Sequence, residues 1–155
     1  MHATPRMESA MPAIPAHADR PPRDARHRVQ RLRDRARYDA PTVHAILDDG
    51  MLAHVAFVAQ AEPDVIQPVV IPMLYARDGN DLLLHGSIAS RLLRELAAGI
   101  PACVAVTHVD ALVLARSHFD HSVNYRSVVA FGHARAITDA AAKADALARF
   151  VDALL

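Results

Sequence analysis

The sequence is poor in the residues that would indicate a disulfide, a membrane span or a secretory signal. Its 155 residues include one cysteine, no tryptophan, four Phe and three Tyr. The single Cys103 excludes a disulfide within the chain, and its apolar surroundings predict a buried, inert thiol in a reducing compartment. No apolar run approaches the roughly 20 residues of a membrane-spanning helix, and the N-terminus lacks the apolar segment of a secretory signal. We therefore expect a cytoplasmic protein, without a membrane partner, whose core is filled by Ala, Val and Leu.

The sequence also lacks a net charge, which excludes a general attraction to nucleic acid. The charge is unevenly divided, because residues 1–40 hold nine arginines and five acids, whereas residues 41–155 hold eight basic and twelve acidic residues. Residues 1–37 also contain five prolines and no apolar period before Val29. This composition predicts a disordered or loosely attached arm, followed by one domain over residues 38–155.

Short apolar runs separated by turn signals dominate the predicted domain. The clearest unit is a strand, an Asp78-Gly79 hairpin turn, a returning strand and a helix that ends at Gly99. Further helices are predicted after the cap Asp39 and from Ala140 to the end of the chain. Six strands are expected, and their short connections favour an antiparallel sheet closed into a barrel, over residues 52–60, 69–76, 81–85, 101–108, 111–116 and 124–137.

One corner of this unit carries the groups of an anion site. Gly86 permits close approach of the backbone, and Ser87, Ser90 and Arg91 place two hydroxyls and a cation at the start of a helix. These residues would suit a phosphate monoester. In the alternative interpretation Ser87 only caps the helix, and Arg91 pairs with Glu95 on a solvated face.

The densest group of potential metal ligands is His118, Asp120 and His121, and His108 and His133 are candidates to lie near it. Their spacing matches no compact zinc pattern, so we favour a loop of hydrogen-bonding histidines and expect no metal. The sequence also lacks a nucleophile elbow, a Walker loop and a dinucleotide glycine pattern.

The last strand begins with polar residues that alternate between two faces. Tyr125 and Ser127 share one face, and Asn124 and Arg126 share the other. Arg126 would therefore reach a phosphate or a partner chain, unless this is an edge strand with ordinary polar side chains.

Six segments together resemble a known family. They read TVHAILDDG, HVAFV, VVIPMLYARDG, LLLHGSIASRLLREL, VTHVDALVLARS and HSVNYRSVVAFGHA, in unbroken order over roughly residues 38–138. The chain resembles the pyridoxamine 5'-phosphate oxidase-like FMN-binding split-barrel family, in particular its nitroimidazole-resistance-type branch. The resemblance implies a mainly β protein with flanking helices, a six-stranded antiparallel split barrel, and a homodimer with FMN at the interface.

The resemblance also implies the FMN site. The strand from Ile71 to Tyr75 would lie along the isoalloxazine ring. Ser90 and Arg91 would hold the phosphate. Arg126 and Ser127 would lie where the oxidases contact the flavin. His85 is our candidate catalytic proton donor, because imidazole exchanges protons near neutral pH. The implied cofactor-binding residues are Ile71, Pro72, Met73, Leu74, Tyr75, His85, Gly86, Ser90, Arg91, Arg126 and Ser127.

Two positions depart from the oxidase pattern, because Leu92 and Tyr75 stand where those enzymes have lysines. The C-terminal residues that bind their substrate have no counterpart, so we expect a C-terminally short chain that is not a vitamin-biosynthesis enzyme. The expected function is an FMN-dependent oxidoreductase that reduces a small molecule of nitro-aromatic or quinone type. The alternative is a non-catalytic flavin-, haem- or deazaflavin-binding module on the same barrel.

Overall fold

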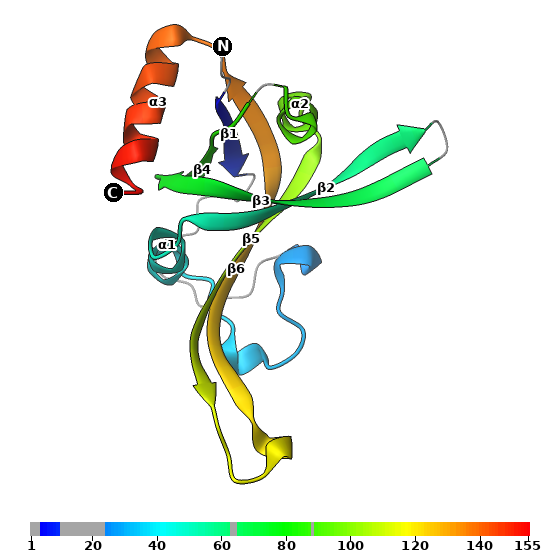
Figure 1. Ribbon diagram of the computed structural model, residues 1–155, viewed down its shortest axis with the longest axis vertical. Helices are drawn as coiled ribbons and strands as arrows, with labels where there is room; N and C mark the ends of the chain where they lie inside the picture. Colours follow the sequence, from blue (N-terminus) through cyan, green and yellow to red (C-terminus); the bar gives the residue numbers. More distant parts are fainter. Residues whose placement is uncertain (1–3, 10–23, 63–64, 88) are drawn as a thin grey trace.

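Six strands form a barrel in the order β1-β4-β3-β2-β5-β6, and every neighbouring pair is antiparallel (Figure 1). The computed structural model describes residues 4–9, 24–62, 65–87 and 89–155, and only the backbone of residues 4–9 and 61–62. The expected fold class, a mainly β antiparallel barrel with flanking helices, is confirmed. The strands are β1 (Thr4–Ser9), β2 (Leu52–Glu62), β3 (Val65–Asp78), β4 (Asp81–Leu84), β5 (Pro101–Val113) and β6 (Ser122–Ile137).

Two of the six strands differ from the prediction. The runs predicted over residues 101–108 and 111–116 form one strand, β5. At Asp110, where we expected a turn, the strand forms a bulge opposite β6 and continues. The remaining strand is β1, which pairs with both β4 and β6 and so joins the two edges of an otherwise open five-stranded sheet. Part of the arm predicted over residues 1–37 therefore belongs to the barrel. Residues 10–23 of that arm lie outside the described residues, and the boundary at residue 38 stays a prediction.

Local sequence signals account for the turns and helix ends. Gly79 has a φ of 65° in the turn between β3 and β4, a conformation that glycine adopts without strain. Asp39 accepts a hydrogen bond from the backbone of Thr42 at 2.9 Å, as a helix cap does. The alternative interpretation in which Ser87 caps the helix is wrong, because the helix begins later and Ser90 is its N-cap. The helices are α1 (Ala40–Asp48), α2 (Arg91–Ala97) and α3 (Ala140–Asp152), with short 3-10 turns η1 (Ala25–His27), η2 (Arg33–Arg35) and η3 (His118–Asp120).

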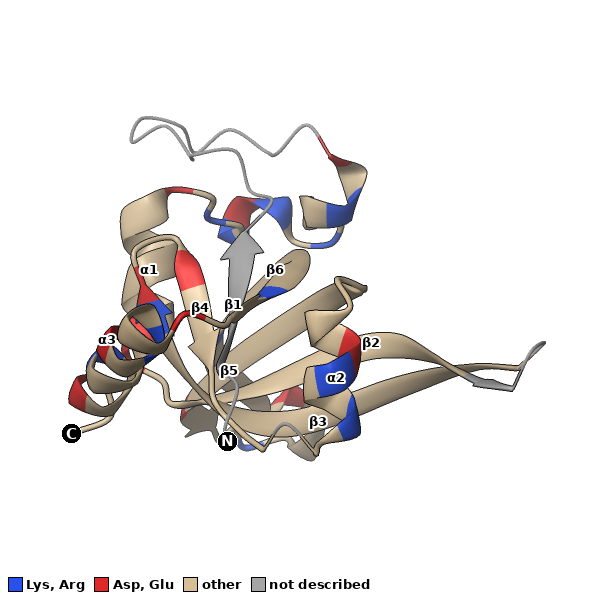
Figure 2. Cartoon of the chain, turned by 90° about the horizontal axis from the view of Figure 1, so that it is seen from above, with Lys and Arg blue, Asp and Glu red and all other residues tan. Residues whose placement is uncertain are grey.

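Two long hairpins extend the sheet well beyond the barrel. The β2–β3 hairpin and the β5–β6 hairpin project in different directions (Figure 1). Most of the strand surface carries no charge, whereas charged residues gather on the helices and on the stretch before α1 (Figure 2). In the described part of the chain, no helix is long and apolar enough to cross a membrane.

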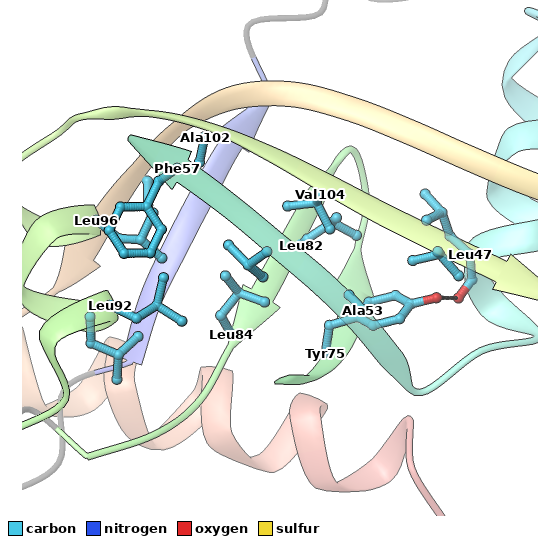
Figure 3. Close-up of a cluster of buried hydrophobic side chains, with 14 of the residues drawn as sticks. Leu47, Ala53, Phe57, Tyr75, Leu82, Leu84, Leu92, Leu96, Ala102 and Val104 are labelled. Atoms are coloured by element: carbon cyan, nitrogen blue, oxygen red, sulfur yellow. Dashed lines mark hydrogen bonds between the residues drawn. The ribbon is translucent and has the colours of Figure 1, made fainter. Parts of the chain in front are cut away.

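The main core lies inside the barrel, where α1 and α2 add their apolar sides (Figure 3). Tyr75 is fully buried there, and its hydroxyl donates a hydrogen bond of 2.6 Å to the carbonyl of Leu47 in α1. A second cluster lies outside the barrel, where Ala146 and Phe150 of α3 cover Ala76 and Leu83. The described outward side chains of β2 and β5 belong to neither cluster.

Candidate cofactor site

The strands β3, β2, β5 and β6 share a surface on the opposite side from the core, which we call the outer face. Strand pairing joins its members in rows, for example Val70, Ala56, Cys103 and Phe131 across the four strands. None of its members is buried, and none is Asp, Glu, Lys or Arg. The outer face comprises Leu52, His54, Ala56, Val58, Pro68, Val70, Pro72, Leu74, Cys103, Ala105, Thr107, Val109, Tyr125, Ser127, Val129 and Phe131.

This face is apolar and exposed. Val70 is 59% exposed, Val129 is 55% exposed and Val109 is 66% exposed. Monomeric proteins rarely expose a continuous apolar patch that extends over four strands. Cys103 is half-buried here rather than buried as predicted, and burial raises the pKa of its thiol.

The strand expected to lie along a flavin ring divides its residues between two sides. Pro72 and Leu74 belong to the outer face, whereas Ile71 and Met73 pack against the core. Tyr75 is enclosed, and its burial, with the nearby charges of Asp48 and Asp49, raises the pKa of its phenol to about 12. Only alternate side chains of a strand can meet one ligand, so Tyr75 could contact it only through its backbone.

His85 and Gly86 follow β4 at the edge of the outer face. Tyr75 pairs with Leu84, and Ala76 pairs with Leu83. Because side chains alternate along the chain, His85 lies on the same side as Leu83. The half-buried imidazole lies 5.7 Å from the ring of Phe150, centroid to centroid, at the edge of α3.

Gly86 lies close to Met73, in the strand that is expected to lie along the flavin ring. A Cβ at Gly86 would meet the Leu93 side chain at 3.1 Å and that of Met73 at 3.6 Å. The structure therefore brings Gly86 and Met73 together, and glycine keeps this approach open.

Ser90 and Arg91 stand together at the start of α2, as the sequence predicted. The Ser90 side chain makes no capping hydrogen bond, so its hydroxyl is not committed to the helix. Arg91 lies 3.8 Å from Glu95, a long contact between side chains that are 46% and 33% exposed. Such an exposed pair contributes about 0.3–0.5 kcal/mol, and it leaves the guanidinium able to turn toward a phosphate.

Arg126 is held elsewhere by two carboxylates. It contacts Asp110 at 3.0 Å and Asp49 at 2.7 Å, which ties β6 to the end of α1. Its hydrogen bonds raise the pKa of its own guanidinium and lower the pKa of Asp110. Ser127 lies on the outer face instead, so Arg126 and Ser127 point to opposite sides of the sheet.

The histidines near the tip of the β5–β6 hairpin form a hydrogen-bonded pair. Nδ1 of His121 accepts a hydrogen bond from the backbone of Ala115 at 3.0 Å, and its Nε2 lies 3.3 Å from Nδ1 of His118. Nε2 of His121 must then carry the proton, whereas a metal ligand needs a lone pair at that atom. No group of three or more metal-ligating side chains occurs in the described part of the chain.

A six-stranded antiparallel barrel with flanking helices and an open apolar face defines a split-barrel protein. The chain belongs to the pyridoxamine 5'-phosphate oxidase family, whose model matches residues 39–155. No curated protein matches the sequence.

The solved structures that are similar to this chain include a flavocytochrome and an FAD and haem binding protein. The flavocytochrome Anf3 from Azotobacter vinelandii is 40% identical, with a TM-score of 0.74 over 85% of this chain. The FAD and haem binding protein from Mycobacterium smegmatis is 39% identical, with a TM-score of 0.68 over 75% of this chain. The chain spans 59% and 54% of the length of these two proteins, respectively.

Sequence reasoning missed the extent of the outer face. Strand β2 alternates the buried residues Ala53, Val55 and Phe57 with the outer residues Ala56 and Val58, so both sides are apolar. Strands that are covered on both faces read as continuous apolar runs. That signal was present in the sequence and would have indicated a second apolar surface outside the barrel.

Proposed function

We propose that this chain binds a flavin, FMN in the first instance, and acts as an oxidoreductase toward a small molecule of nitro-aromatic or quinone type. The observation that carries the proposal is the continuous uncharged outer face on a barrel of this family. A flavin supplies the electron-transfer chemistry when it is bound, and the protein supplies position and hydrogen bonds.

The residues present fit such a cofactor at the edge of the outer face. Pro72 and Leu74 offer apolar contacts for a flat ring. A Cβ at Gly86 would point to the core side chains of Leu93 and Met73, so Gly86 would meet the ring through its backbone. The proposed phosphate partners are Ser90 and Arg91, since a hydroxyl and a guanidinium donate strong hydrogen bonds to phosphate oxygens.

His85 is the proposed proton donor to a bound substrate. Its half-buried position beside Phe150, at the edge of the outer face, supports this role. A protonated imidazole can give its proton to the substrate, whereas a glutamine amide cannot. We therefore expect His85→Gln to lower turnover while flavin stays bound.

A homodimer is the proposed assembly. A second copy would cover the outer face by a twofold contact between identical surfaces, which needs no charge complementarity. The flavin would then lie at the margin of this interface, beside Pro72 and Leu74.

The second candidate is a haem-binding or flavin- and haem-binding module without catalytic activity of its own. It is favoured by one specific observation, namely that the similar structures include a flavocytochrome and an FAD and haem binding protein. One barrel can support several functions, so only the bound group separates these candidates.

Absorption spectra of the purified full chain would test both candidates. We expect the spectrum of oxidised flavin, which bleaches on addition of NADH or NADPH and returns with a nitro-aromatic or quinone acceptor. A Soret band without flavin would favour the second candidate. A colourless protein that takes up neither FMN nor FAD would contradict the proposed function.

An Arg91→Ala variant tests the phosphate partner. We expect the Kd for FMN to rise by about tenfold, because a charged hydrogen bond to the phosphate is lost, while riboflavin affinity stays unchanged. The matched control is Arg116→Ala, an exposed arginine near the tip of the β5–β6 hairpin. Unchanged FMN affinity in fluorescence titrations of Arg91→Ala would remove this residue from the site.

A further inference from the structure

His54 is a polar side chain within the apolar outer face. It lies on β2, where it pairs with Pro72 of β3 on one side and with Ala105 of β5 on the other. Residues that pair directly across antiparallel strands project from the same face of the sheet, with their Cβ atoms about 5 Å apart. His54 is exposed, and in the part of the chain that the structure describes its imidazole has no hydrogen-bond or ion-pair partner.

The neighbours of His54 on the outer face are mostly apolar and carry no charge. They lie two positions away along β2 and diagonally across on β3 and β5, and they are Leu52, Ala56, Val70, Leu74, Cys103 and Thr107. Covering a polar group is unfavourable unless the group gains a hydrogen bond. A ligand that covers His54 must therefore offer a hydrogen-bond partner to its imidazole.

His54 also lies beside the proposed flavin position. The proposed ring contacts are Pro72 and Leu74 of β3, and β2 is one of the two neighbours of β3. The other neighbour is β4, and His85 follows its last residue. His54 and His85 therefore stand on opposite flanks of the proposed ring position, two strand spacings or roughly 10 Å apart across the sheet.

We propose that His54 binds an oxygen atom of the small-molecule acceptor and so helps to select which acceptors react. The inference rests on the proposed function, which places a flavin beside Pro72 and Leu74 and a nitro-aromatic or quinone acceptor next to it. Both classes of acceptor carry oxygen atoms that accept hydrogen bonds. An imidazole offers an N–H donor in its neutral and in its protonated form. His54 would meet the acceptor from the β2 side, and His85 from the β4 side.

The chemistry of the acceptor gives this donor its effect. A quinone becomes a hydroquinone when it gains a hydride from the reduced flavin and a proton from the protein, the role proposed for His85. Negative charge accumulates on the acceptor oxygen as the hydride arrives. A hydrogen bond from His54 to that oxygen strengthens as the charge develops, and it therefore lowers the barrier to the transfer.

The test isolates the step in which the acceptor is reduced. The full chain is loaded with FMN, reduced with a stoichiometric amount of dithionite without oxygen, and mixed with benzoquinone or ferricyanide in a stopped-flow instrument. Ferricyanide is the control acceptor, because it takes single electrons and needs no proton. The variants are His54→Leu, which removes the donor, and His54→Gln, which keeps an N–H donor. Thr107→Val is the matched control, since Thr107 is an exposed polar residue of the outer face on β5.

We expect His54→Leu to slow the oxidation of the bound flavin by benzoquinone at least about tenfold, because one hydrogen bond to the developing charge is lost. Its oxidation by ferricyanide and its Kd for FMN should match wild type. His54→Gln should keep most of the wild-type rate with benzoquinone. Thr107→Val should match wild type with both acceptors.

The remaining outcomes separate the inference from the proposed function. Equal benzoquinone rates for wild type and for a His54→Leu variant with a wild-type circular dichroism spectrum overturn the inference alone. An equal slowing with both acceptors, or a raised Kd for FMN, also overturns it, because His54 would then act on the flavin and not on the acceptor. A wild-type chain that binds no flavin contradicts the proposed function, and the inference with it.

Discussion

Single residues at the end of α1 explain how this helix is joined to the barrel. The carbonyls of Ile46 and Leu47 accept hydrogen bonds from the His108 imidazole at 2.9 Å and the Tyr75 hydroxyl at 2.6 Å. A Cβ at Gly50 would lie 2.8 Å from atoms of both side chains, so only glycine fits there. Tyr75 therefore stabilises the fold beneath the proposed site and does not provide a side chain to a ligand.

A Tyr75→Phe variant should separate stability from binding. We expect the free energy of unfolding in urea to fall by about 1 kcal/mol, because the Leu47 carbonyl loses one of its donors inside the core. Flavin affinity should not change. Tyr125→Phe is the matched control, since Tyr125 is 60% exposed. Equal stability of wild type and Tyr75→Phe would contradict a structural role for this hydroxyl.

The same tyrosine predicts a dependence of stability on alkaline pH. Burial raises the pKa of Tyr75 from 10.0 to about 12, so the folded state holds this proton more tightly than the unfolded state. The stabilisation is complete below pH 10 and is lost as the pH rises toward 12. Urea unfolding from pH 9 to 12 should show a smaller loss for Tyr75→Phe than for wild type. Parallel curves would contradict this assignment.

At the scale of elements, the barrel depends on a strand from the arginine-rich end of the chain. Arg6 of β1 pairs with Leu83 of β4 and with Arg135 of β6, so one short strand satisfies two sheet edges. Unpaired edges expose backbone donors and acceptors and invite association between chains.

Deletion of residues 1–9 should loosen both edges. We expect faster amide hydrogen exchange in β4 and in the β6 segment opposite β1, because these amides lose their shared partner. The ladder between β2 and β3 does not touch β1 and is the internal control. Identical exchange of the deleted and the full chain at both edges would show that β1 does not close the barrel in solution.

At the scale of the whole molecule, the outer face is uncharged over four strands. Its extent supports the second copy proposed as its partner.

A Val70→Glu variant should dissociate the proposed homodimer. A twofold interface would bury two new carboxylates without cations opposite them, so we expect the dimer Kd to rise at least about tenfold. Val151→Glu on α3 is the control, because Val151 is 50% exposed on a different surface and Val70 is 59% exposed. Sedimentation velocity that shows wild type as a monomer at all concentrations would contradict the dimer.

Much of this architecture follows from local sequence. Asp78-Gly79 specifies the hairpin turn and Asp39 caps α1, since turns and caps depend on neighbouring residues. The neighbouring positions of Ser90 and Arg91 at the start of α2 were likewise predictable, because the two residues are consecutive in the sequence. The alternation of Tyr125, Arg126 and Ser127 was also predictable, because side chains on a strand repeat every two residues.

The sequence by itself determined the antiparallel strand class, the Asp78-Gly79 turn, the Asp39 cap of α1 and the family to which the chain belongs. Only the tertiary structure decided that β1 joins the barrel, that Arg126 is held by Asp49 and Asp110, and that Tyr75 faces α1. It also decided that the imidazole of His27 stacks on the ring of Phe131. These contacts join residues far apart in the chain, and their choice depends on loop closure and packing that no short segment encodes.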